Sequence, residues 1–461
     1  MMPIMPITKQ SQPIKTVKQH LEDAGYKDAE LIPMAAILYH AGGLDGIVKK
    51  FPQLNLEQEY IETTKTTDPK QVDEFHRQHK ILFQNPEYKK IFNLLYYHLE
   101  NKLLEMKYEN ILSQECDFDD FLEALQKNFF RKYRGNKERQ DVSDLDNDLP
   151  SIKSSLVHLF KKAGLVTEVL PSKTQYDAAL VFGATYVSME DRLQYLLKMK
   201  TEGKINAVPP VYVLAGARDL WLDSTSDKYT AEMIAQKINI EQSANPEITP
   251  EPIFNSPEIT PEITENSSEI TPAQIHKKGM EIFDAINNDK KNEGEARKAV
   301  VKYFQDTYKI TWPTEADAAE YLMQKYQNNN PGLINKYYIV NAPKKSNGNR
   351  PDTFDTIKQF ITDIKLKPEF MARKGKERNI LACSEQPYVN SQNATLKYLQ
   401  ELSPQLHTET IGQASSTFAK DNIDEISNAS VKNILAEIAG QFYKIKQVEQ
   451  ALARQSNIVL A

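Results

Sequence analysis

A short apolar run that stops at a small-residue turn is the pattern around which the chain is organised. In YDAALVFGATYVSMEDR, residues 176–192, the apolar positions end at Gly183 and an amphipathic helical pattern follows. A continuous apolar run of this length is typical of a strand buried on both faces of a parallel sheet. The pattern therefore predicts a strand over residues 177–182 that leads into a crossover helix.

An apolar run followed by a helical pattern recurs further along the chain. The apolar runs VYVL, YYIV and NILAC predict three more strands, at residues 211–214, 337–340 and 379–383, and helical patterns separate them. Strands that alternate with helices build parallel sheets from βαβ units. We therefore expect an α/β fold over residues 151–402. It would be a Rossmann-like three-layer domain with a mostly parallel sheet, joined to a helical N-terminal region and a C-terminal helix.

The segments before and after this region carry other patterns. Residues 1–15 are prolyl and polar and predict a disordered leader, whereas residues 16–134 show helical periodicity with many Tyr, Phe and Leu side chains. Residues 135–150 are strongly charged, become acidic and end in proline, which is typical of a surface linker. Residues 403–461 predict a C-terminal helical segment that begins with a polar, turn-rich stretch.

One stretch within the expected sheet region repeats a short motif. The tripeptide Glu-Ile-Thr, mostly followed by Pro, recurs between residues 241 and 272. Proline at this density is incompatible with a helix or an interior strand. We interpret residues 241–272 as a disordered surface insertion between two halves of one domain. An interdomain linker is the alternative.

Composition narrows the class of protein. The chain carries 57 basic and 63 acidic side chains, interspersed along its length, so a general nucleic-acid-binding face is not expected. Two cysteines exclude a disulfide framework and fit a reducing compartment. Neither a membrane-spanning run nor an N-terminal secretion signal is recognisable. These features predict a cytoplasmic protein without a membrane span, with signal-independent secretion as the alternative.

The standard catalytic motifs are absent from the sequence. It contains no GxGxxG, GxxxxGK[ST], HExxH, GxSxG or CxxC, and none of its eight histidines falls in a loop after a predicted strand. A serine–histidine triad or a histidine-ligated metal is therefore not expected in the crevice of the predicted sheet.

Polar residues that follow the four predicted strands are the candidates for a ligand site. The carboxyl ends of parallel strands share one edge of a sheet, so these residues should surround one crevice. Glycines let backbone amides approach a ligand, and arginines can hold a phosphate or a carboxylate. Structural alternatives exist: Arg192 could pair with a core carboxylate, and Thr353 and Thr356 could cap a helix. The candidate ligand-binding residues are Gly183, Thr185, Arg192, Gly216, Arg218, Arg350, Thr353, Thr356, Ser384 and Gln386.

Taken in order, the segments DAALVFGA, VYVLAGAR, TEADAAEYLM, NRPDTFDTI and ILACSEQPYVNSQ resemble the SanA/YdcF/ElyC-type domain family over residues 175–402. The resemblance implies a Rossmann-like fold with a cleft for a nucleotide or S-adenosylmethionine. It matches Glu315 to the glutamate of the family's Ser/Thr-Glu-Ala helix and Ser384 to its final turn. The chain departs from the family after the last strand: the family often has a histidine and an arginine there, whereas this chain has Gln386, Pro387, Tyr388 and Gln392.

Two classes of function follow from these observations. The first is an enzyme or ligand-binding protein, a hydrolase or transferase if catalytic, for an anionic small molecule that is nucleotide-like, phosphorylated or S-adenosylmethionine. Glu315 is then the candidate general acid or base, and Arg192, Arg218 and Arg350 would bind the anion. The second is an exported effector or interaction protein whose N-terminal helices bind a protein partner while the α/β domain serves as a scaffold. The fold alone does not decide between them.

Overall fold

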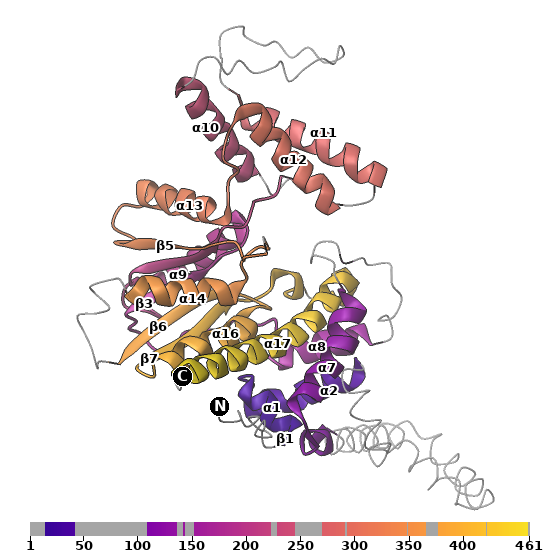
Figure 1. Ribbon diagram of the computed structural model, residues 1–461. Helices are drawn as coiled ribbons and strands as arrows, with labels where there is room; N and C mark the ends of the chain where they lie inside the picture. The colour runs from indigo at the N-terminus through magenta and orange to yellow at the C-terminus, as the bar shows by residue number, and fades with distance from the viewer. Residues whose placement is uncertain are drawn as a thin grey trace, which may run out of the picture. The chain divides into compact units, whose positions relative to one another are not determined.

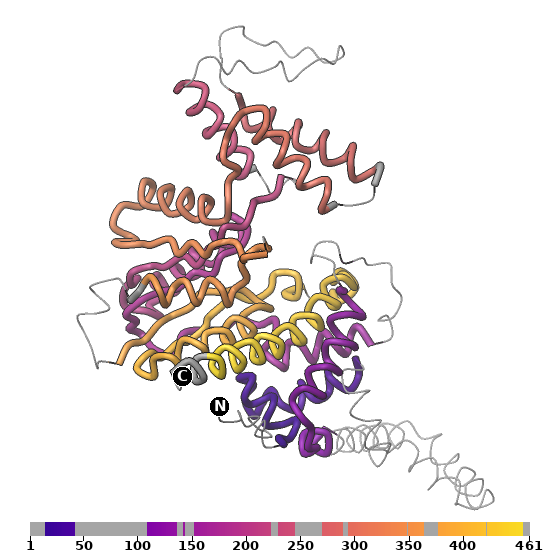
Figure 2. Tube along the Cα trace, viewed as in Figure 1, coloured from indigo at the N-terminus to yellow at the C-terminus, as the bar shows by residue number. Residues whose placement is uncertain are grey.

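The structure is a computed structural model, and its described residues form two compact units. The α/β unit comprises Val169–Glu385 and Thr395–Gln413, and the helical unit comprises Met1–Glu168, Gln386–Ala394 and Ala414–Ala461. The residues that the structure describes are 14–41, 108–135, 142, 152–222, 228–244, 270–290, 293–347, 349–365, 377–420 and 422–459 (Figures 1 and 2).

A parallel sheet forms the centre of the α/β unit. Its strands are β3 (Ala178–Phe182), β4 (Val211–Gly216), β5 (Tyr337–Ala342), β6 (Arg378–Glu385) and β7 (Leu406–Gln413). They lie in the order β5-β4-β3-β6-β7, and every neighbouring pair is parallel (Figure 1). This confirms the predicted α/β fold with a mostly parallel sheet. The strand order reverses between β3 and β6, and in such sheets ligands bind beyond the carboxyl ends of the strands near that point.

Helices cover both faces of this sheet and complete three layers. The helices that follow its strands are α9 (Tyr186–Thr201), α10 (Lys228–Ala244), α11 (Pro272–Lys290), α12 (Glu293–Tyr308), α13 (Glu315–Asn329), α14 (Thr353–Lys365) and α16 (Val389–Leu402). Val181 and Val213 pack with α9 and α13 in one core cluster. On the other face Phe360 of α14 contacts Tyr212, with 5.2 Å between ring centroids. Tyr212 and Val213 serve opposite layers because side chains alternate along a strand.

Between β4 and α13 the chain leaves the sheet and builds a helical insertion, α10–α12 (Figure 1). The insertion has its own hydrophobic core, which includes Ile234, Phe304 and Trp312. The segments that enter and leave it are hydrogen-bonded to each other. Leu220 N donates to Pro313 O at 3.1 Å, and Trp312 Nε1 donates to Leu220 O at 2.9 Å. The insertion is thereby joined to the sheet at the carboxyl end of β4.

The helical unit combines segments from both ends of the sequence around one core. Phe121 packs edge-on against Phe442 with 5.1 Å between ring centroids. Tyr26 Oη donates to Gln441 Oε1, and Gln441 Nε2 donates to Ala24 O, each at 2.7 Å. The described elements of this unit are β1 (Lys15–Thr16), α1 (Val17–Asp23), α2 (Asp28–His40), β2 (Glu115–Cys116), α7 (Phe118–Leu125), the π-helix η2 (Gln126–Arg131), α8 (Lys153–Lys162), the 3-10 helices η5 (Ser416–Phe418) and η6 (Ile423–Glu425), and α17 (Asn428–Val459).

Two sequence-based boundaries need correction. The stretch predicted to open a C-terminal helical segment at residue 403 contains β7, which pairs with β6 and extends the sheet beyond residue 402. The insertion predicted over residues 241–272 overlaps α10, which runs to Ala244, and Ile270, which is 6% exposed in the core of the helical insertion. Ile270 is also fixed by Asn239, whose side-chain amide bonds to both its backbone N and its backbone O.

Other predictions concern residues outside the described ranges. These are most of the leader at residues 1–15, the central part of the helical N-terminal region at residues 42–107, nearly all of the linker at residues 135–150, and residues 245–269 of the repeat segment. At the leader's end, Lys15 lies in β1 and pairs with Cys116 of β2 in a small antiparallel sheet.

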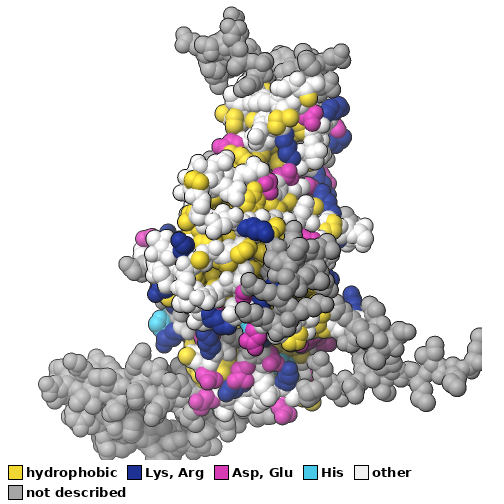
Figure 3. Space-filling view, turned by 90° about the vertical axis from the view of Figure 1, so that its left-hand side faces the viewer, with side chains coloured by type: hydrophobic (Ala, Val, Ile, Leu, Met, Phe, Trp, Pro, Cys, Tyr) yellow, Lys and Arg dark blue, Asp and Glu magenta, His cyan; other side chains and the backbone are white. Residues whose placement is uncertain are grey.

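The surface of the described residues carries both signs of charge. On the face shown in Figure 3, basic and acidic side chains are interspersed among apolar ones. No helix within the described ranges combines the length and apolar character needed to cross a membrane.

Candidate functional site

Glu315 is the first residue of α13 and lies beside the loop that follows β4. The preceding Thr314 caps the helix: its hydroxyl accepts from Asp317 N, and the Asp317 carboxylate accepts from Thr314 N at 2.7 Å. Glu315 N donates to Arg218 O at 2.8 Å. This reciprocal cap and the bond to Arg218 fix the position of Glu315.

Two glycines at the ends of β3 and β4 make room for the Glu315 carboxylate. Its Oε2 accepts a hydrogen bond from Gly216 N at 3.1 Å. A Cβ on Gly183 would lie 2.9 Å from the carboxyl group and 2.4 Å from Leu214 O, so a side chain cannot be accommodated there. The Glu315 side chain is 7% exposed. The glycines therefore place a buried carboxylate at the strand ends.

Burial and nearby positive charges act in opposite directions on this carboxyl group. The pKa of Glu315 is raised from its ordinary 4.5 to about 7, and burial is the largest cause, because the charged form loses hydration. The Arg218 guanidinium lowers the pKa, as do the Gly216 N–H bond and the charges of Arg192 and Arg350. A carboxyl with a pKa near neutrality can both accept and release a proton at physiological pH.

Arg192 of α9 binds groups at the carboxyl ends of the two inner strands β3 and β6. Its Nη1 donates to Phe182 O at 2.6 Å and to Gly183 O at 3.0 Å, and its Nη2 pairs with Glu385 Oε1 at 2.9 Å. The residue is 3% exposed. Arg192 thus joins the ends of β3 and β6. The sequence left open whether Arg192 binds a ligand or pairs with a carboxylate of the protein, and in the structure it pairs with Glu385.

The loop before α14 approaches the same region. Gly216 packs under Pro351, since a Cβ on this glycine would lie 2.4 Å from Pro351 Cγ. Arg350, the preceding residue, has an exposed side chain, and its charge reaches Glu315 strongly enough to lower the carboxyl pKa. Arg350 therefore belongs to the rim of the site, whereas Glu315 is buried within it.

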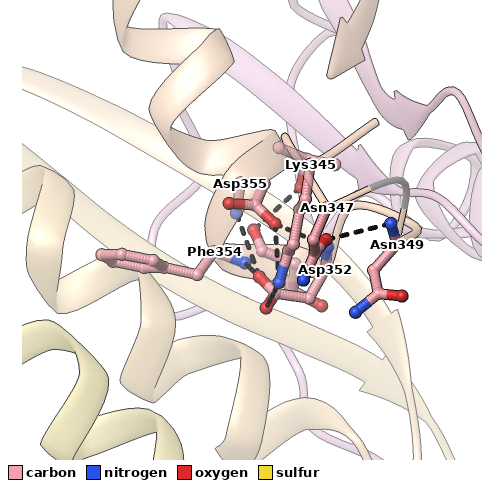
Figure 4. A network of polar contacts seen from close by, with 8 residues as sticks. Lys345, Asn347, Asn349, Asp352, Phe354 and Asp355 are labelled. Carbon is pink, nitrogen blue, oxygen red and sulfur yellow. Dashed lines mark hydrogen bonds and ion pairs between the residues drawn. The ribbon is translucent and has the colours of Figure 1, made fainter. Parts of the chain in front are cut away.

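Asp352 anchors this loop to α14 (Figure 4). Its Oδ1 accepts hydrogen bonds from Phe354 N at 2.9 Å and Asp355 N at 3.1 Å, and its Oδ2 pairs with Lys345 Nζ at 2.8 Å. Asp352, and not Thr353, therefore supplies the side-chain cap of the helix.

A cavity of about 30 Å³ adjoins Glu315. Thr185 and Arg218 line it, together with Trp221 and Tyr229 from the base of the helical insertion. Thr185 also caps α9, since its hydroxyl accepts from Ser188 N at 3.4 Å. The cavity therefore brings together residues from the end of β3, the end of β4 and the insertion.

Two of the remaining candidates bond within α14. Thr356 Oγ1 donates to Thr353 O at 2.9 Å, and Thr356 N donates to Asp352 O at 3.1 Å. These bonds belong to the first turn of the helix, so the two threonines are not part of the Glu315 contact group.

The two candidates at the end of β6, Ser384 within the strand and Gln386 just after it, also bond to the protein itself. Ser384 is fully buried, and its hydroxyl donates to Glu385 O at 3.3 Å. Gln386 Nε2 donates to Gly164 O at 2.8 Å and to Thr167 O at 2.9 Å within the helical unit. A polar residue at the end of a strand commonly satisfies buried backbone groups, and Ser384 and Gln386 both do so.

Sequence reasoning did not select Glu385, Trp221 or Tyr229 as site residues. Glu385 follows the predicted strand NILAC after one serine. A carboxylate at this position could have been predicted from the sequence as a partner of Arg192. Trp221 and Tyr229 follow the second strand by several residues, and no local pattern distinguishes them from core aromatics. Their role at the cavity depends on how the helical insertion packs.

The fold and the site define an α/β protein with a buried carboxylate, close to arginines, at the carboxyl ends of the strands of a parallel sheet. Comparison of the chain with protein-family models, with curated proteins and with solved structures found no match. Among the described residues, His, Cys, Asp and Glu side chains form no group of three or more arranged to hold a metal ion. The residues of the site are therefore the basis on which a function can be assigned.

Proposed function

We propose that the α/β unit is an enzyme that uses Glu315 as a general acid and base on an anionic small molecule. The observation that supports this most is the Glu315 carboxyl itself, buried beside Gly183 and Gly216 with a pKa of about 7. A carboxyl with a perturbed pKa in a crevice at strand ends is the usual setting of proton-transfer residues. The charges of Arg218 and Arg350 would favour an anionic substrate.

The substrate classes that we propose are phosphorylated compounds, nucleotides and S-adenosylmethionine, with hydrolysis or group transfer as the reaction. Membership of the SanA/YdcF/ElyC-type family is part of the same proposal, and its support is the motif TEADAAEYLM that contains Glu315. Arg192 acts in this scheme as a positioning residue, since its nitrogens hold Phe182 O, Gly183 O and Glu385.

The test combines a ligand screen with a variant of Glu315. In the thermal unfolding of the full chain, a true ligand at about 100 times its Kd adds roughly 2.7 kcal/mol of stability. With a compound that is turned over, Glu315→Gln should lower kcat by about 10²- to 10⁴-fold. Glu320→Gln, on the same helix, is the matched control and should retain activity. A Glu315 carboxyl that titrates near 4.5 by ¹³C NMR would contradict the proposed acid–base role.

A further inference from the structure

Lys237 of α10 contacts the chain on both sides of Glu315. Its Nζ donates to Thr311 O at 3.3 Å and to Asp317 Oδ1 at 3.0 Å. An ammonium group has three donors, so it can make both bonds at once. Thr311 belongs to the segment that leaves the helical insertion, and Asp317 belongs to the first turn of α13. One side chain of the insertion therefore joins the two segments between which Glu315 lies.

The Asp317 carboxylate uses its two oxygens for different partners. Oδ2 accepts from Thr314 N and from Thr314 Oγ1, each at 2.7 Å, and Oδ1 accepts from Lys237. Burial raises the pKa of Asp317, whereas the bonds from Thr314 and Lys237 lower it, and the pKa lies below the ordinary 3.8. The carboxylate is therefore charged at neutral pH and can hold both partners. The helix cap that fixes Glu315 is itself held by the insertion.

A second contact joins α10 to α13. Tyr321 Oη donates to Glu232 Oε2 at 3.1 Å. Tyr321 lies about one helical turn after Asp317, so α10 holds the first two turns of α13 at two points. A displacement of the insertion relative to the sheet would therefore carry the start of α13 with it. It would draw Glu315 away from Gly216 N, which lies 3.1 Å from the carboxylate oxygen Oε2.

We infer that Lys237 is a positioning residue for Glu315, through which the helical insertion α10–α12 holds the carboxyl group against the end of β4. Lys237 acts through Asp317 and Thr311 and need not touch a substrate. The insertion is then a working part of the site, although the parallel sheet is complete without it. The catalytic meaning of this inference rests on the proposed function, in which Glu315 transfers a proton.

The test is a ¹³C NMR titration of Glu315 in the full chain, with its signal assigned by its absence in Glu315→Gln. Lys237→Met removes the ammonium group and keeps most of the apolar stem. A loosened start of α13 admits water to the carboxyl group, so the pKa of Glu315 should fall from about 7 by about one unit. Loss of a positive charge that acted directly on Glu315 would raise the pKa instead. The sign of the change therefore separates positioning from a direct charge effect.

Two further variants serve as controls. Lys237→Arg keeps a cation that can reach both acceptors, so it should restore the wild-type titration. Lys302→Met removes an ion pair from α12 of the same insertion, where Lys302 Nζ lies 2.5 Å from Asp306 Oδ2, and it should leave the pKa of Glu315 unchanged. The side chains of Lys237 and Asp317 are 29% and 38% exposed, so Lys237→Met should lower the melting temperature by at most about 2–4 °C.

The amide signal of Gly216 gives a second measurement, because this amide donates to Glu315 Oε2. Lys237→Met should shift the signal, and Lys302→Met should not. The inference is overturned if neither the Gly216 signal nor the Glu315 pKa changes in Lys237→Met, if that pKa rises, or if Lys302→Met has the same effects. With wild-type Glu315 titrating near 7, these outcomes remove the inference alone. A wild-type Glu315 that titrates near 4.5 removes the proposed acid–base role, and the Gly216 signal alone then decides the inference.

Discussion

At the scale of single residues, Glu315 shows how position determines chemical behaviour. As the first residue of a helix, a glutamate is ordinarily exposed and ionised. Here the absence of side chains at Gly183 and Gly216 lets the carboxylate pack against the sheet edge, where burial opposes ionisation. Arg218 offsets part of that effect. The result is a carboxyl group that can exchange a proton near neutral pH.

Replacing Glu315 by Gln should flatten the pH dependence of stability. The native pKa of about 7 lies above the ordinary 4.5, so the native state holds a proton that the unfolded state releases. The resulting contribution to stability is complete below pH 4.5 and is lost as the pH rises through 7, by about 3 kcal/mol at most. Urea unfolding at pH 5, 6, 7 and 8 should show this loss in the wild type and in Glu320→Gln. An equal loss in Glu315→Gln would contradict the assignment.

Replacing Gly183 by Ala should destabilise the α/β unit. The added Cβ would lie 2.4 Å from Leu214 O, a backbone atom of the adjacent strand that cannot move independently of the sheet. We expect a loss of about 2–3 kcal/mol in the free energy of unfolding and a displaced Glu315. Gly440→Ala is the contrasting variant, because the nearest atom would be 4.0 Å away and alanine favours a helix by about 0.5–1 kcal/mol. Urea unfolding followed by circular dichroism gives the free energy of unfolding of each variant. A Gly183→Ala protein as stable as the wild type would refute the predicted steric clash.

At the scale of elements, the N-terminal caps of three helices fix the loops at the carboxyl ends of the strands. Thr314 caps α13, Thr185 caps α9, and Asp352 supplies the side-chain cap of α14. Each cap satisfies first-turn amides that the helix itself cannot satisfy. The three helices begin after strands or next to strand ends, so their caps also set the positions of Glu315 and Arg350.

Two substitutions of Asp352 should separate its capping role from its ion pair. Asp352→Ala removes the acceptor for Phe354 N and Asp355 N, and should cost about 1 kcal/mol of stability. Asp352→Asn keeps an acceptor and loses the pair with Lys345. Both partners of that pair are more than a third exposed, so its loss should cost well under 1 kcal/mol. Urea midpoints should therefore rank wild type, Asn and then Ala, and equal losses in both variants would rule out capping as the main role.

At the scale of the whole molecule, the two ends of the sequence meet in one core. Tyr26 and Gln441 are 415 positions apart and share a buried hydrogen bond. Phe121 and Phe442 pack in the same core cluster. The helical N-terminal region therefore depends on α17 for its stability, and neither can be removed without exposing apolar surface of the other.

Replacing Phe442 by Ala should lower the protection of helices from the other end of the chain. Phe442 is 0% exposed, and its removal leaves a cavity next to Phe121 that should cost about 3–5 kcal/mol. Hydrogen exchange should then become faster in α7, over Phe118–Leu125. The adjacent Tyr443 is 49% exposed, so Tyr443→Ala should leave exchange in α7 unchanged. Unaltered exchange in Phe442→Ala would show that the two segments are energetically independent.

Much of the α/β fold was predictable, because its strongest signals are local. The runs predicted at residues 177–182, 211–214, 337–340 and 379–383 correspond to β3, β4, β5 and β6. The missed strand, β7, has the sequence LHTETIGQ and lies at the edge of the sheet. An edge strand pairs on one side only and tolerates polar residues, so it lacks the continuous apolar run of its neighbours.

The sequence by itself determined the strands β3 to β6, the helices that follow them, the glycines at the ends of β3 and β4, and the cap at Thr314, since these depend on residues a few positions apart. Only the tertiary structure decided which polar residues meet. It turned Gln386 toward Gly164, paired Arg192 with Glu385, and brought Trp221 to the cavity beside Glu315. The physical reason is that strand order and the packing of the helical insertion set these contacts. Both depend on burial of apolar surface between segments that are distant in sequence.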